Sequence, residues 1–164
     1  MDGLTIRRAT VADLEAINAI YNHYVLTSTA TYQIAPETLE ARRAWFEAHD
    51  EQHPVIVAEV QGRVLGWGAL SPFHTREAYA RTVEDSVYIH HDHHRHGLGG
   101  ALLEELVHLG RQLGHRTIIA GVDSERAASI ALHERYGFAL VGRLNAVGYK
   151  FNRWLDVIYL QRML

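Results

Sequence analysis

The chain contains no cysteine, which excludes disulfides, thiolate metal sites and cysteine nucleophiles. No apolar run reaches the roughly 18 residues that a membrane-spanning helix needs, so no membrane partner is expected. Only 3 prolines occur in the 164 residues, and no linker or low-complexity tract divides them, so we expect a single domain over residues 1–164. The segment Met1-Asp2-Gly3 begins no basic stretch followed by an apolar core, which predicts no secretory signal and a cytoplasmic location.

Excess positive charge is also missing. The 16 basic residues are outnumbered by 19 acidic ones, for a formal net charge of −3. Proteins that bind nucleic acid are usually basic, so no nucleic-acid partner is expected. Hydrophobic residues at 48% and charged residues at 21% are typical of a globular protein.

Hydrophobic periodicity predicts a mixed α/β protein whose strands and helices alternate along the chain. Thr10 and Asp13 fit a capping box before the first helix, Pro36 is expected to open the second, and Gly114 to end the third. The predicted strands are 4–8, 55–60, 64–70, 81–89, 117–122, 139–147 and 155–161, and the predicted helices are 14–24, 36–46, 98–113 and 127–136. This order predicts a mixed sheet with helices on both faces.

The sharpest local feature is a strand that runs into a basic, glycine-containing turn and then a helix, over Tyr88 to Ala101. Helix N-termini present unpaired N–H groups, and glycines allow a close approach of the backbone, so this turn suits a phosphate. Arg95 adds a positive fork for phosphate oxygens. The alternative is a helix that simply begins at a flexible turn. The spacing matches neither the dinucleotide nor the ATP-binding glycine motif.

These residues resemble a known family. His94-Arg95-His96-Gly97-Leu98-Gly99 is similar to the [QR]-x-x-G-x-[GA] motif of the GNAT superfamily of acetyltransferases, with His94 in place of Gln or Arg. The segment Ser129 to Phe138 resembles S-x-x-L-H-x-x-x-G-[FY] of its phosphinothricin and methionine sulfoximine N-acetyltransferase branch. Further matches, such as Asn22-His23-Tyr24 and Trp154-Leu-Asp156, follow in the family's order over nearly the whole chain.

The resemblance implies the GNAT fold, a mostly antiparallel sheet in which one parallel strand pair splays apart to admit acetyl-CoA, the co-substrate. No metal is implied. Backbone groups of one strand would pair with the pantetheine arm, and the glycine turn would hold the diphosphate. Arg126 stands where the family usually has an Asn that contacts the pantetheine arm. The implied cofactor-binding residues are Val87, Tyr88, Ile89, Arg95, His96, Gly97, Leu98, Gly99, Gly100 and Arg126.

Glu84 matches the family's glutamate and is the predicted general base, because acetyl transfer needs a neutral amine. The alternative is a charged residue on a solvated strand face. His133 is predicted either to protonate the leaving thiolate or to line the amine site, and otherwise is a structural histidine. An amide near Tyr88 would stabilise the oxyanion. Asp85 departs from the apolar or small residue that is usual in the family.

The loop Phe73 to Tyr79 leads into the Glu84 strand and resembles the family's acceptor loop. Arg76 is predicted to bind an anionic group of the acceptor, with Phe73, Tyr79 and Tyr32 as apolar walls, although Arg76 is equally typical of a solvated loop. The implied acceptor is a small amino-acid-like amine of the phosphinothricin, methionine sulfoximine or methionine sulfone type. The alternatives are another small amine, a protein N-terminus, or a CoA-binding sensor without turnover.

The resemblance also implies a homodimer, with Tyr149, Phe151 and Trp154 either at its interface or in the core. A second unusual feature is the cluster of His90, His91, His93, His94 and His96, which suggests a metal site. A catalytic metal site normally also needs orienting second-shell partners, and the cluster lies where the family binds phosphate, so no metal site is expected. The alternative is a histidine-rich metal carrier.

Overall fold

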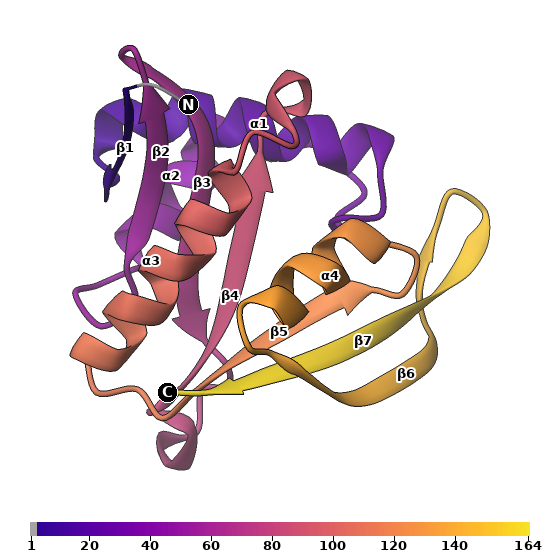
Figure 1. Ribbon diagram of the computed structural model, residues 1–164. Helices are drawn as coiled ribbons and strands as arrows, with labels where there is room; N and C mark the ends of the chain where they lie inside the picture. The colour runs from indigo at the N-terminus through magenta and orange to yellow at the C-terminus, as the bar shows by residue number, and fades with distance from the viewer. Residues whose placement is uncertain (1–2) are drawn as a thin grey trace.

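A computed structural model describes residues 3–164 of the chain. These residues form a seven-stranded sheet with the strand order β1-β2-β3-β4-β5-β7-β6 (Figure 1). The strands are β1 Leu4–Arg8, β2 Val55–Val60, β3 Arg63–Pro72, β4 Thr82–Ile89, β5 Thr117–Asp123, β6 Ala139–Lys150 and β7 Arg153–Met163. The helices are α1 Leu14–Thr27, α2 Leu39–Glu47, α3 Leu98–Gln112 and α4 Ala127–Arg135. The predicted order of strands and helices is confirmed.

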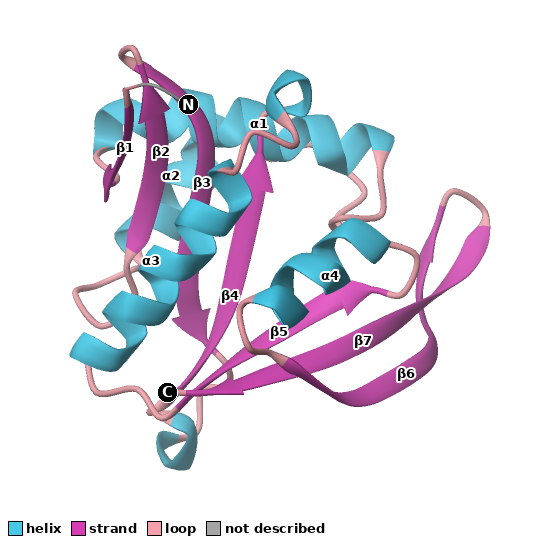
Figure 2. Cartoon of the chain, in the orientation of Figure 1, coloured by secondary structure: helices cyan, strands magenta, loops and turns pink. Residues whose placement is uncertain are grey.

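The helices cover both faces of the sheet, as predicted (Figure 2). One apolar cluster packs α3 against the sheet and includes Leu102, Leu106 and Ile118. A second cluster packs α1 against the opposite face and includes Ile17, Tyr24 and Trp67. The sheet is therefore an inner layer whose central strands β3 and β4 are covered on both sides.

Every neighbouring strand pair is antiparallel except β4 and β5, which run parallel. Their connection contains α3, as parallel pairing requires a crossover. Figure 1 shows β4 and β5 starting side by side near the C-terminus and then separating toward their carboxyl ends. This geometry confirms the predicted splayed pair.

Two local predictions fail for identifiable reasons. Pro36 does not open the second helix: α2 begins at Leu39, because the Thr38 side chain accepts a hydrogen bond from the Ala41 N–H and caps it. The alternative of core burial for the C-terminal aromatic residues is also wrong, since Tyr149 and Phe151 are exposed and Trp154 is 65% exposed.

No helix within residues 3–164 combines the length and apolarity that crossing a membrane requires.

Candidate active site

A cleft opens where β4 and β5 part. The two strands pair over only three positions, from Thr82↔Thr117 to Glu84↔Ile119. Beyond Glu84 lies a cavity of about 540 Å³, lined by β4 up to Ile89, by the last part of β5, by the N-terminus of α3 and by one side of α4. The predicted opening between parallel strands is therefore present, and it is large enough for an extended ligand.

Strand alternation decides which backbone groups of β4 face this cleft. The His90 N–H donates to the Leu65 carbonyl on the β3 side. Because successive residues point their backbone groups to opposite edges of a strand, those of Tyr88 also face β3, whereas those of Val87 and Ile89 face the cleft. This corrects the prediction for Tyr88. The residue lines the cleft, but its backbone neither pairs with a ligand there nor provides the oxyanion amide.

The turn between β4 and α3 has the backbone geometry of an anion cradle. Arg95 and Gly97 have positive φ values of 64° and 81°, and α3 starts at Leu98. The first helical hydrogen bond runs from the Ala101 N–H to the Gly97 carbonyl, so the N–H groups of residues 98–100 have no partner within the helix. A Cβ at Gly100 would lie 2.5 Å from the Tyr136 hydroxyl oxygen, so a larger residue here would force the Tyr136 side chain to move.

Two basic side chains lie beside this cradle. Arg95 and Arg126, the latter directly before α4, both line the cleft. His96 is exposed and its side chain does not line the cleft; the contact predicted for it, through its backbone N–H, stays a prediction. An anion with several oxygens would thus meet backbone N–H groups on one side and guanidinium groups on the other.

His94, the departure from the family motif, binds within the protein. Its Nε2 lies 2.8 Å from the Tyr24 hydroxyl, which itself donates to the Ile89 carbonyl. Nε2 therefore carries a hydrogen and donates to Tyr24. Burial, with the nearby Arg126 charge, lowers the pKa of His94. At neutral pH the ring is uncharged and ties the turn to α1.

Glu84 lies where the two strands part and lines the cleft. Its carboxylate forms no hydrogen bond with any residue of the described range 3–164. Burial, together with the Asp85 charge, raises the pKa of Glu84. A carboxylate that is poorly solvated, unpaired and held in a cleft is suited to accept a proton.

His133 and Asp85 form a buried ion pair on the other side of β4. His133 Nε2 lies 2.9 Å from Asp85 Oδ2, and Nδ1 lies 2.7 Å from the Ser129 carbonyl oxygen. Burial lowers the pKa of His133, but the hydrogen bond and charge of Asp85 outweigh it, so the pKa is raised. This pair could not be predicted from the sequence, because the two residues are 48 positions apart.

The model of the acetyltransferase (GNAT) family matches residues 17–138 of the chain. The chain belongs to this family. It is 42% identical, over 96% of its own length and 92% of the relative, to an L-methionine sulfoximine/L-methionine sulfone acetyltransferase of Pseudomonas paraeruginosa. It is 38% identical to a phosphinothricin N-acetyltransferase of Streptomyces viridochromogenes, with coverages of 96% and 86%.

The solved structures agree with these relatives. A GNAT superfamily phosphinothricin acetyltransferase from Sinorhizobium meliloti, in complex with acetyl-CoA, superposes with a TM-score of 0.95 at 39% identity, over 99% of this chain and 89% of that one. The predicted GNAT fold is therefore confirmed.

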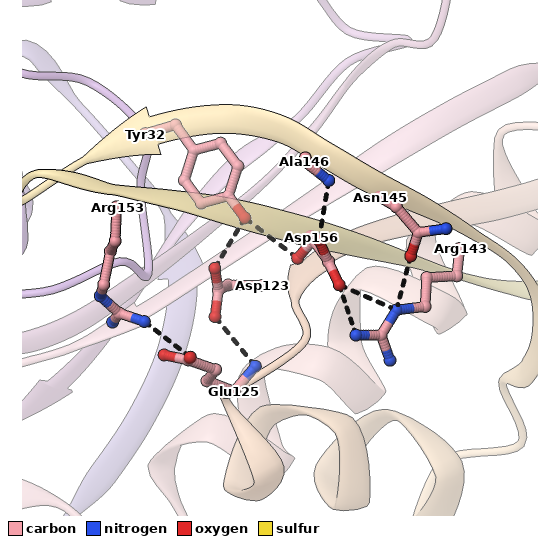
Figure 3. A network of polar contacts seen from close by, with 8 residues as sticks. All are labelled: Tyr32, Asp123, Glu125, Arg143, Asn145, Ala146, Arg153 and Asp156. Carbon is pink, nitrogen blue, oxygen red and sulfur yellow. Dashed lines mark hydrogen bonds and ion pairs between the residues drawn. The ribbon is translucent and has the colours of Figure 1, made fainter.

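Tyr32 is the one predicted acceptor residue that reaches the GNAT cleft, through Asp123. Its hydroxyl donates to Asp123 Oδ2 at 2.6 Å and also contacts the Asp156 carbonyl oxygen at 3.1 Å (Figure 3). Asp123 is buried at the end of β5 and lines the cleft. The Tyr32 ring also lies over Gly148, where a Cβ would come within 2.5 Å of it.

The other predicted acceptor residues lie outside the GNAT cleft. Phe73 and Tyr79 pack edge to face at 5.8 Å, and Arg76 is exposed between them without an ion pair to any of residues 3–164. None of the three lines the cleft. Glu84 and His133 thus both line the cleft, and Tyr32 contacts its lining residue Asp123. The loop from Phe73 to Tyr79 lies outside the cleft lining. The position of Asp123 in the cleft was not predicted from the sequence, although an acidic residue directly after a predicted buried strand is typical of a functional site.

The histidine cluster lies on the surface beside the GNAT anion cradle. The imidazole rings of His23 and His91 stack at 3.9 Å with an angle of 10°, and those of His90 and His91 stack at 4.4 Å with an angle of 19°. Imidazole lone pairs lie in the ring plane, so stacked rings direct them side by side. One ligand atom from each of His90, His91 and Asp92 lies within 4.8 Å of the others, so these three residues group the atom types that bind metals; that no metal is needed stays an expectation.

Proposed function

We propose that this protein is an acetyl-CoA-dependent N-acetyltransferase that acetylates the amine of a small amino-acid-like acceptor of the phosphinothricin, methionine sulfoximine or methionine sulfone type. The observation that carries this proposal is the cleft between β4 and β5, with an unpaired carboxylate where the strands part and an anion cradle at its other end. The names of the relatives, at 42% and 38% identity over nearly the whole chain, support this acceptor class.

The residues of the cleft fit acetyl-CoA, which supplies the acetyl group as a reactive thioester. The N–H groups of residues 98–100, with Arg95 and Arg126, would hold its diphosphate. The free backbone edge of Val87 and Ile89 would pair with the pantetheine amides in the way that an added strand does. Tyr24 already occupies the Ile89 carbonyl, which leaves Val87 as the principal partner.

Glu84 acts as the general base. An α-amino group has a pKa near 8, so only about a tenth of it is neutral at pH 7. Glu84 lies where an amine would enter the gap, and it accepts the proton that the nitrogen loses on attack. The Val87 amide is the backbone donor that faces the gap closest to Glu84, and it is placed to stabilise negative charge on the carbonyl oxygen.

His133 acts as the acid on the opposite side of the gap. Side chains of neighbouring strand residues point to opposite faces, so Glu84 faces the side of α1 while Asp85 and its partner His133 lie on the side of α3 and α4. The anion cradle at the start of α3 belongs to this second side. The base Glu84 therefore lies on one face of β4, on the side of the amine, and the acid His133 lies on the other face, on the side of the sulfur.

We further propose that the protein works as a cytoplasmic homodimer. Support comes from an apolar surface on β6 and β7, and Trp154 is its most exposed member. Exposed patches of this kind commonly mark interfaces. The residues of this surface are Leu140, Val141, Leu144, Val147, Tyr149, Phe151 and Trp154. Light scattering of the purified protein should give twice the monomer mass of 18.6 kDa, and the monomer mass would contradict the dimer.

A thiol-release assay with acetyl-CoA tests the activity. Methionine sulfone, methionine sulfoximine and phosphinothricin should each release CoA, whereas spermidine and a peptide with a free N-terminus should not. Mass spectrometry should find one acetyl group on the acceptor nitrogen. Tight acetyl-CoA binding without release for any amine would overturn the proposal in favour of a CoA sensor, and turnover of the peptide alone would move the acceptor to a protein N-terminus.

A further inference from the structure

Asp85 is a buried carboxylate that acetyl transfer does not obviously require. Its side chain is 1% exposed, and that of its partner His133 is 7% exposed. Asp85 Oδ1 has no hydrogen-bond partner among residues 3–164. A half-satisfied buried carboxylate costs stability, and a small apolar residue would fill this position without that cost. This cost points to a function for Asp85 other than packing.

The contacts of His133 fix its protonation state. The Ser129 carbonyl oxygen can only accept, and it lies 2.7 Å from Nδ1, so Nδ1 carries a hydrogen. Nε2 lies 2.9 Å from Asp85 Oδ2, and the hydrogen bond and charge of Asp85 raise the pKa of His133, which favours a proton on Nε2 as well. The Phe138 ring packs perpendicular to the imidazole, with the ring centroids 5.0 Å apart.

Burial alone would lower the pKa of His133 and leave the ring neutral, because burial disfavours a charged imidazole. Even a histidine with the ordinary pKa of about 6.5 is only about 3% protonated at pH 8. Without a buried anion beside it, His133 would have no proton to give at the pH where amines become reactive. Asp85 is the charged group that contacts the ring.

We propose that Asp85 is a positioning residue for acetyl transfer: it holds His133 as an oriented imidazolium and so keeps a proton in place for the departing sulfur. This inference rests on the proposed function. Nδ1 is turned back onto the carbonyl of its own helix, and Nε2 lies toward Asp85 in the cleft lining. The proton that leaves is therefore the one that Nε2 shares with Asp85 Oδ2, and its hydrogen bond to the carboxylate breaks as it passes to the sulfur.

His133 gives this proton to the sulfur as the carbon–sulfur bond breaks with its electron pair on sulfur. The Nε2–H bond breaks, an S–H bond forms, and the ring becomes neutral with Nδ1 still protonated. The Nε2 lone pair then faces the Asp85 carboxylate. This repulsion favours recovery of a proton from solvent, which resets the acid for the next turnover.

Other ionisable groups border the same cleft, and the experiment must separate them from Asp85. Glu84 belongs to β4, Asp123 to β5 and Arg135 to α4, and Arg126 lies directly before α4. The start of α3 contributes only uncharged residues. The turn before α3 adds His93, His94 and Arg95. None of these forms a hydrogen bond with His133, whose side-chain partners within the described residues are Ser129 and Asp85.

The first test is nuclear magnetic resonance of the wild-type protein without ligand. The ¹⁵N signals of the His133 ring, assigned by their loss in His133→Gln, should show two protonated nitrogens at pH 7.5. In Asp85→Asn, which keeps the volume and an acceptor oxygen, the pKa of His133 should fall. A neutral His133 in the wild type at pH 7.5, or the same pKa in both proteins, would overturn the proposal.

The second test is the pH dependence of kcat. The loss in Asp85→Asn should grow from pH 6 to pH 8, toward the roughly 30-fold that a histidine of ordinary pKa would lose at pH 8, while KM for acetyl-CoA stays unchanged. Asp50→Asn is the matched control, because Asp50 pairs with His53 at 2.8 Å on the surface. If kcat of Asp85→Asn is reduced by the same factor at every pH, Asp85 has only a structural role and the proposal is overturned. If the wild type itself transfers no acetyl group, the proposed function fails instead.

Discussion

Replacing Glu84 by Gln separates the chemistry of this site from its structure. The carboxylate forms no hydrogen bond within the described residues, and Gln has almost the same volume, so the change breaks no contact. Burial and the Asp85 charge raise the pKa of Glu84, which means that the fold favours its neutral form. Its ionisation therefore costs stability as the pH rises through the unfolded value of 4.5 and then through the folded pKa. At pH 7, Glu84→Gln should unfold at the same temperature as the wild type or at a higher one.

The catalytic activity of Glu84→Gln should fall, although its thermal stability does not. A positioned general base contributes about 10²–10⁴-fold, so kcat/KM for methionine sulfone should fall by that factor at pH 7. The variant must use amine that is already neutral, and this fraction rises from about one tenth at pH 7 to about nine tenths at pH 9. The ratio of variant to wild-type rate should therefore increase about tenfold over this range. His133 is common to both proteins and cancels from the ratio.

The assay is thiol release at saturating acetyl-CoA from pH 6 to pH 9, with calorimetry of acetyl-CoA binding beside it. Binding should be unchanged. Glu104→Gln is the control, because Glu104 is an exposed carboxylate on α3 and should change neither rate nor binding. A Glu84→Gln rate within about threefold of the wild type at pH 7, or a ratio that does not vary with pH, would refute the assignment of the base.

Four further outcomes are expected. Gly100→Ala should weaken acetyl-CoA binding measured by calorimetry, because its Cβ would lie 2.5 Å from the Tyr136 hydroxyl oxygen and would displace the cradle. Arg126→Ala should weaken the same binding by about tenfold, with a smaller loss at high salt. Trp154→Glu should convert the dimer to a monomer in light scattering. Asp13→Asn should lower the free energy of unfolding by about 1–3 kcal/mol at pH 7. Arg7 lowers the pKa of Asp13, so this difference should be present above the unfolded value of 3.8 and should vanish, in denaturant titrations, as the pH falls through the folded pKa.

The sequence carried the parts of this site that are local in the chain. The glycine turn before α3 is a continuous segment, and its positive φ values at Arg95 and Gly97 follow from the demands of a tight turn. The opening beside Glu84 followed from the family resemblance and from the strand–helix–strand order. Periodicity located each strand to within a few residues, because the strands β2 to β5 bury apolar side chains; β6 is mostly exposed but is rich in apolar residues.

The contacts that join distant segments could not be predicted in this way. Asp85 meets His133 across the gap between β4 and α4, and His94 meets Tyr24 of α1. Nothing in either segment alone specifies these partners, because they depend on how the helices pack. The position of the loop at Arg76 could not be predicted for the same reason, because it is set by the strands that carry the loop, and its role toward the acceptor stays a prediction.

Glu84 and Asp85 are consecutive residues with opposite tasks, and only the pleat of the strand keeps them apart. Insertion of a single residue just before this pair would exchange their faces, so that Glu84 would meet His133 and Asp85 would meet the incoming amine. Function therefore depends more on the length of this strand than on its composition. Substitutions along the strand are tolerable, whereas the insertion or deletion of a single residue is not.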